Sequence, residues 1–231
     1  MQIVVDAVRH ENEEAHPLFF AMRVAFFVFA TLVLYWVIHA GIERFGHRAI
    51  AAENGPLEIA QVVLALVGAG FLMLAAKVSP IGQSGMGVSA LLLCFAAARE
   101  MDSLLERWFF EDAYTWMVGI PLASQAVALL WRRRHFLLVD LKWMSQIPSA
   151  TLFVVAGIFL CSVCQFLDRP GVWGEGAFPL DESHPSYPVK LAIEESCELF
   201  AYTLLAYAGF DGYLVARRAR AAVRRRTAAA W

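Results

Sequence analysis

Three glutamates, Glu194, Glu195 and Glu198, lie in a long apolar segment that runs from Pro188 to Tyr213. A segment of this length and composition can cross a membrane as a helix. An ionised carboxylate at membrane depth is strongly unfavourable unless it is paired, protonated or bound to a cation. The sequence therefore predicts that these glutamates have partners elsewhere in the chain.

Two other apolar segments carry charged residues near one end. Glu58 follows Pro56 at the start of one segment, and an Arg-Glu-Met-Asp run beginning at Arg99 ends another. Helical spacing places Glu195, Glu198 and Tyr202 on one face. We expect these groups to meet at one level of a helical bundle. The candidate ligand- or proton-binding residues are Glu58, Arg99, Glu100, Asp102, Glu195 and Glu198.

A structural interpretation exists for each of these residues. Glu58 is placed where a glutamate caps the start of a helix, and Glu194 is placed to reach lipid headgroups. The remaining acids fit an internal ion-pair network centred on Arg99. That network has one arginine for four acids, so the surplus negative charge predicts bound protons or a bound cation.

A divalent metal is one cation that such a cluster would hold. Carboxylates with a nearby histidine suit Mn, Fe, Ca or Zn, and the candidate metal ligands are Glu100, Glu195, Glu198 and His184. The Glu195-x-x-Glu198 pair has no histidine at the spacing typical of di-iron bundles. A proton relay or an organic cation needs no histidine and fits equally well, so the sequence does not identify the cation.

The composition predicts how these residues are positioned. Of the 231 residues, 59% are hydrophobic and 17% are charged, whereas about a quarter of a soluble domain is charged. We predict an all-α, polytopic membrane bundle of about six spans. They cover about 18–39, 56–76, 88–107, 114–131, 147–167 and 188–213.

Around this bundle, residues 1–17 are a predicted polar tail, 18–216 the membrane bundle and 217–231 a basic tail. Within the bundle segment, Arg23 is expected to extend to the near interface. The short segment Phe136–Gln146 mixes apolar and charged residues and is expected to lie along the membrane surface.

Basic residues predict the orientation of the bundle. In a six-span chain, Lys77, the Arg132–Arg134 loop and the C-terminal arginines lie on one side. The positive-inside rule places that side, with both termini, in the cytoplasm. The acids of the second, third and sixth predicted spans then face outward. This pattern predicts a multi-pass protein of a bacterial-type inner (plasma) membrane.

A Cys-x-x-Cys pair, Cys161 and Cys164, lies in the fifth predicted span. Over these four residues the chain resembles quinone-linked disulfide-forming proteins of the vitamin K epoxide reductase type. That resemblance implies redox activity, but no second pair of loop cysteines is present to relay electrons. Buried cysteines in membrane helices also serve as small packing residues.

Three functional hypotheses follow from these patterns. The first is a membrane protein that binds a metal ion or a proton at an outward-facing carboxylate cluster and uses it for transport. The second is a membrane-embedded, metal-dependent enzyme that acts on a lipid or a lipid-linked substrate. The third is an accessory subunit of a membrane complex.

The expected partner of the chain is the lipid bilayer. The C-terminal arginines are interpreted as a topology signal rather than a nucleic-acid site.

Overall fold

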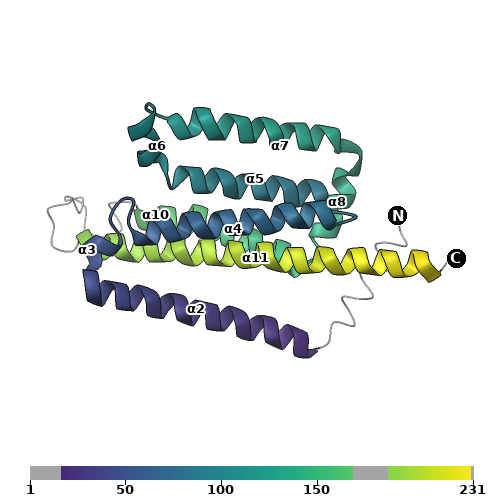
Figure 1. Cartoon of the computed structure of the whole chain (residues 1–231), viewed down its shortest axis with the longest axis horizontal. Helices are drawn as coiled ribbons and strands as arrows, with labels where there is room; N and C mark the ends of the chain where they lie inside the picture. Colours follow the sequence, from purple (N-terminus) through teal and green to yellow (C-terminus); the bar gives the residue numbers. More distant parts are fainter. Residues whose placement is uncertain (1–16, 169–186, 230–231) are drawn as a thin grey trace.

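The structure is a computed structural model that describes residues 17–168 and 187–229. Every regular element in these two ranges is helical, so the prediction of an all-α chain is confirmed there. In Figure 1 the long helices lie lengthwise beside one another, and α11 extends along the whole bundle. The elements are α2 (Pro17–Phe45), α3 (His47–Ile50), α4 (Pro56–Val78), α5 (Gln83–Arg99), α6 (Asp102–Trp108), the π-helical turn η1 (Thr115–Gly119), α7 (Ile120–Arg132), the 3-10 turn η2 (Arg134–Phe136), α8 (Leu137–Met144), α9 (Pro148–Phe159), the π-helical turn η3 (Leu160–Cys164), α10 (Gln165–Asp168) and α11 (Tyr187–Ala229).

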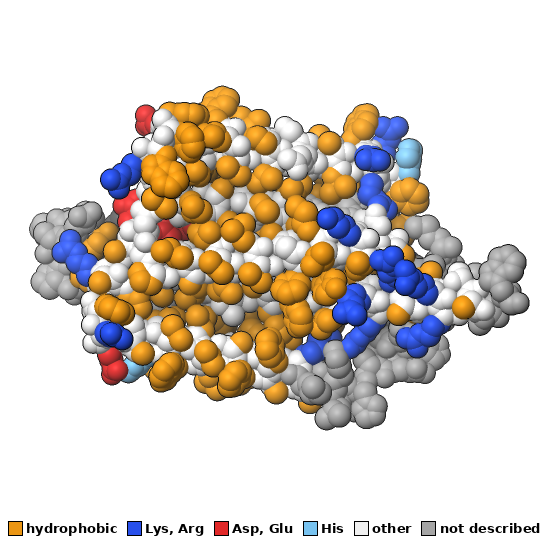
Figure 2. All heavy atoms as spheres, viewed as in Figure 1, with side chains coloured by type: hydrophobic (Ala, Val, Ile, Leu, Met, Phe, Trp, Pro, Cys, Tyr) orange, Lys and Arg blue, Asp and Glu red, His pale blue; other side chains and the backbone are white. Residues whose placement is uncertain are grey.

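Four helices in the described ranges are long and apolar enough to cross a membrane, which indicates a membrane protein. They cover Arg23–Phe45, Pro56–Val78, Pro148–Leu167 and Tyr187–Arg225. Figure 2 shows hydrophobic side chains over the middle of the visible face and charged side chains near its two ends. The helices at the third and fourth predicted spans are shorter than these four. Helix α5, at the third, has 17 residues, and α7, at the fourth, has 13 residues after the π-helical turn η1.

Small residues bring α4 and α11 close together at the centre of the bundle. A Cβ atom added to Gly209 would lie 2.6 Å from the carbonyl oxygen of Gly68, and one added to Gly68 would lie 3.0 Å from the Cα of Ala206. Close backbone approach at small residues is a common way for membrane helices to associate. The contact fixes how far α4 is displaced along α11, and therefore which polar residues of the two helices meet.

The third predicted span is interrupted where continuity was expected. Helix α5 ends at Arg99, Glu100 and Met101 form a turn, and α6 begins at Asp102. Met101 has φ −106° and ψ 16°, outside the helical region. The predicted third span, over about 88–107, is therefore not one continuous helix.

Helix α8, in the segment expected at the membrane surface, anchors the start of α5 through Asp140. Asp140 is 2% exposed and accepts hydrogen bonds from the backbone N–H groups of Gly82, at 2.8 Å, and Ser84, at 3.1 Å. The Ser84 hydroxyl also donates to this carboxylate. A carboxylate at a helix N-terminus satisfies N–H groups that have no partner within the helix.

Candidate functional site

Buried carboxylates gather where α4 and α11 begin and α5 ends, at the left of Figure 1. Glu198 is 6% exposed and Glu100 is 9% exposed, while Glu195 is half-buried. Glu198 is close enough to interact electrostatically with Glu100, Glu195 and Arg99. The structure therefore brings together acids that are about 100 residues apart in the chain.

Tyr202 links α11 to the end of α5. Its hydroxyl donates a 2.7 Å hydrogen bond to Oε1 of Glu100, and its side chain is fully buried. The same Glu100 oxygen lies 4.0 Å from Nε of Arg99, at the limit of an ion pair. Glu100 thus receives one hydrogen bond from an uncharged donor and only loose charge compensation from the neighbouring guanidinium group.

Gln61 of α4 holds Glu195 in position. Nε2 of this fully buried amide donates both to the Glu195 carboxylate, at 2.8 Å, and to the Glu195 backbone carbonyl, at 3.1 Å. Oε1 of Gln61 is buried without a hydrogen-bond partner in the described part of the chain. The sequence analysis missed Gln61, although an amide in the second turn of an apolar helix is a signal that it could have used.

Glu58 and Asp102 have local structural partners. The Glu58 carboxylate accepts a hydrogen bond from the backbone N–H of Asn54, as expected for a glutamate that caps the start of α4. Asp102 accepts from the N–H of Ser103 at 2.5 Å, and the Asn54 side chain donates to the Ser103 hydroxyl at 3.0 Å. These contacts join the loop before α4 to the start of α6, at the edge of the carboxylate group.

Glu194 is balanced within its own helix. Its carboxylate lies 3.1 Å from Nζ of Lys190, one turn earlier, and both side chains are 11% exposed. The structure gives Glu194 an ion-pair partner within the protein, and its contact with lipid headgroups stays a prediction. This pair distinguishes Glu194 from Glu198, which faces other carboxylates and Arg99.

The described residues contain no group of three His, Cys, Asp or Glu side chains placed to hold a metal ion. Of the candidate metal ligands, Glu100, Glu195 and Glu198 are near one another, and His184 lies outside the described residues. Cys161 and Cys164 are free thiols, the first exposed and the second buried. The geometry therefore lends no support to a metal ion or to a disulfide at these positions.

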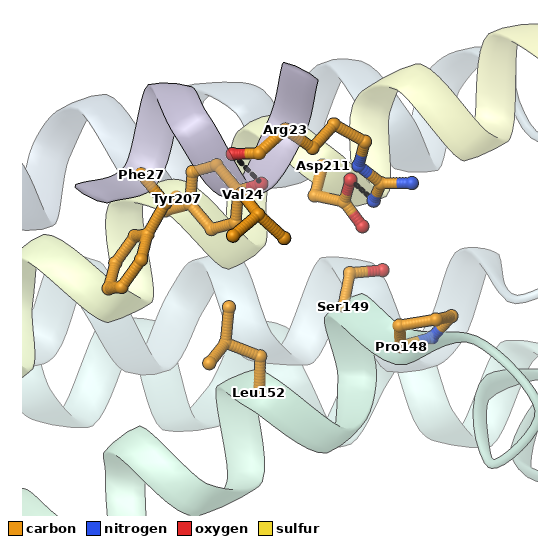
Figure 3. Close-up of a pocket in the computed structure, with 8 residues that line it drawn as sticks. All are labelled: Arg23, Val24, Phe27, Pro148, Ser149, Leu152, Tyr207 and Asp211. Carbon is orange, nitrogen blue, oxygen red and sulfur yellow. Dashed lines mark hydrogen bonds and ion pairs between the residues drawn. The ribbon is translucent and has the colours of Figure 1, made fainter. Parts of the chain in front are cut away.

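A second charged group lies elsewhere on α11. Arg23 of α2 forms an ion pair with Asp211, and the Tyr207 hydroxyl donates to the Arg23 carbonyl oxygen at 3.1 Å. The pair lies beside a cavity of about 220 Å³. Figure 3 shows Ser149 of α9 on the side opposite the pair. The sequence analysis expected Arg23 to extend to the membrane interface and did not name Asp211 as a candidate site residue. One basic and one acidic residue, each within an apolar segment, could have indicated this ion pair.

No family model, curated protein or solved structure matches this chain.

Proposed function

We propose that the protein is a multi-pass protein of a bacterial-type inner (plasma) membrane that binds a cation, namely a proton, at the buried carboxylates Glu100, Glu195 and Glu198. One observation carries this proposal: Glu100 and Glu198 are both almost fully buried and close enough to interact, with Arg99 as the cation that faces them. One arginine does not balance two carboxylates. A proton shared within the group removes the surplus charge.

A proton suits the geometry better than a metal ion does. Each carboxylate already has a different neighbour, because Tyr202 donates to Glu100 and Gln61 donates to Glu195. Carboxylates arranged around a divalent ion would instead direct several oxygens at one point. A protonated Glu198 has one O–H donor, and its electrostatic neighbours Glu100 and Glu195 have carboxylate oxygens that can act as acceptors.

The proposed topology has six spans, with α5 and the η1–α7 segment as the two shorter ones and both termini in the cytoplasm. The end of α4, which carries Lys77, the end of α7, which carries Arg132, and the C-terminal end of α11 lie towards the right of Figure 1. Figure 2 shows most of the visible Lys and Arg side chains towards that end. Under the positive-inside rule it is the cytoplasmic end, and the carboxylates then lie at the outer end.

Infrared spectroscopy of the reconstituted protein tests the proton site. The wild-type protein should show a protonated-carboxyl band that disappears as the pH is raised, and Glu198→Gln should remove or shift it. Glu194→Gln is the matched control, because it makes the same change on the same helix at an acid already paired with Lys190. The proposal fails if Glu198→Gln leaves the band unchanged. Loss of the wild-type band on adding Ca²⁺ or Mn²⁺ at constant pH would instead identify a metal ion.

A further inference from the structure

A cavity of about 430 Å³ lies between α5, the α9–α10 segment and α11, next to the carboxylates. Its walls are mostly apolar, with Phe95 of α5, Phe153 of α9 and Leu205 of α11 among them. Its volume is within the range of about 300–1,000 Å³ typical of small-molecule sites. Arg99 and Tyr202 also line it, so the cavity has polar groups as well as apolar walls.

Arg99 is the unexplained group in this cavity. Its side chain is 45% exposed, its nearest carboxylate oxygen is 4.0 Å from Nε, and it makes no hydrogen bond with any residue in the described ranges. A guanidinium group has five N–H donors in a planar fork that matches a carboxylate. Donors facing an apolar cavity at the edge of a membrane require an acceptor.

The wall formed by the α9–α10 segment leaves room for a ligand. The π-helical turn η3 contributes Leu160 and Cys161 to the cavity, and π-helical turns occur frequently at functional sites. Gly157, one turn before Cys161, also lines it, and a Cβ atom added there would meet no atom within 4 Å. The space beside Gly157 is therefore open to a ligand rather than filled by side chains.

We propose that this cavity binds a single-chain fatty acid, with its hydrocarbon chain along Phe95, Phe153 and Leu205 and its carboxylate hydrogen-bonded to Arg99. The apolar walls match one hydrocarbon chain, and the single guanidinium fork matches one planar carboxylate head. This inference rests on the proposed function, because ionised Glu100 and Glu198 would repel an anionic head unless a cation neutralises them.

Electron paramagnetic resonance with a doxyl-labelled stearic acid tests the proposal on the full chain in phosphatidylcholine nanodiscs. The wild-type protein should immobilise the probe saturably, and unlabelled palmitate should displace it. Hexadecanol, which has the same chain without the charge, should displace it at least about tenfold less well. Arg99→Gln should weaken palmitate binding by about tenfold or more, because it removes a charge-assisted hydrogen bond.

A pair of glycine variants separates the cavity from the general lipid surface. Gly157→Leu places a side chain in the cavity and should abolish saturable immobilisation. Gly70→Leu adds the same side chain on α4, where there is also open space but where the residue does not line this cavity. This variant should leave the saturable immobilisation of the probe intact. Equal effects of the two variants, equal displacement by hexadecanol, or no saturable immobilisation would each overturn the proposal.

The same samples distinguish this inference from the proton site. An intact protonated-carboxyl band without fatty-acid binding overturns the cavity proposal alone. Saturable, Arg99-dependent binding in a protein that lacks the band overturns the proton proposal and leaves the cavity assignment standing. In Glu198→Gln this side chain is uncharged at every pH, as it is when protonated, so palmitate binding should be kept.

Discussion

Replacing Gly209 by alanine should destabilise the bundle, although alanine is the better helix former. The new Cβ atom would lie 2.6 Å from the carbonyl oxygen of Gly68 and 3.2 Å from its Cα and carbonyl carbon. These are backbone atoms, so no side-chain rotation relieves the overlap. Contacts between such atoms are favourable only near 3.5–4.0 Å, so α4 and α11 must separate locally by roughly 0.5–1 Å.

The magnitude follows from two opposing terms. Overpacking of this kind costs about 1–3 kcal/mol, and a local gap of roughly 0.5–1 Å forfeits about a quarter to a half of each dispersion contact that it opens. Replacing glycine by alanine within a helix returns about 1 kcal/mol through helix propensity. The same gain without the clash is expected for Gly70→Ala, because a Cβ atom there meets nothing within 4 Å.

The two variants should therefore differ in free energy of unfolding by about 1–3 kcal/mol, with Gly209→Ala the less stable, since the propensity terms cancel. Equilibrium unfolding in mixed micelles of a mild detergent and sodium dodecyl sulfate, followed by circular dichroism, measures this difference. Equal stability of the two variants, or a more stable Gly209→Ala, would show that α4 and α11 do not approach as closely as the structure indicates.

Three further substitutions test the polar contacts by the same unfolding assay. Tyr202→Phe should cost about 1.5–3 kcal/mol, because it removes a hydrogen bond to the buried Glu100 carboxylate; a neutral result would place the hydroxyl elsewhere. Asp211→Ala should cost about 3 kcal/mol by leaving the Arg23 charge without this carboxylate, whereas the double variant Arg23→Met/Asp211→Leu should recover most of the loss. Asp140→Ala should cost about 1–2 kcal/mol by removing the acceptor at the start of α5, and no change would argue against that cap.

The sequence was sufficient to predict features that depend on neighbours along the chain. The Pro56–Glu58 segment contains the proline and the capping glutamate that begin α4, and both are found as expected. The spacing of Glu195, Glu198 and Tyr202 likewise determines that they share a face of α11. Local geometry and the apolar composition decide these features, so no tertiary information was needed.

Only the tertiary structure decided which polar groups meet. Gln61 and Glu195 are 134 residues apart, and Arg23 is 188 residues from Asp211, so helical periodicity does not relate them. Their contacts depend on how far each helix is displaced along α11, and backbone approach at glycine and alanine sets that displacement for α4. The break after Arg99 depends on packing in the same way, because the turn at Glu100 brings that carboxylate to Tyr202 on α11.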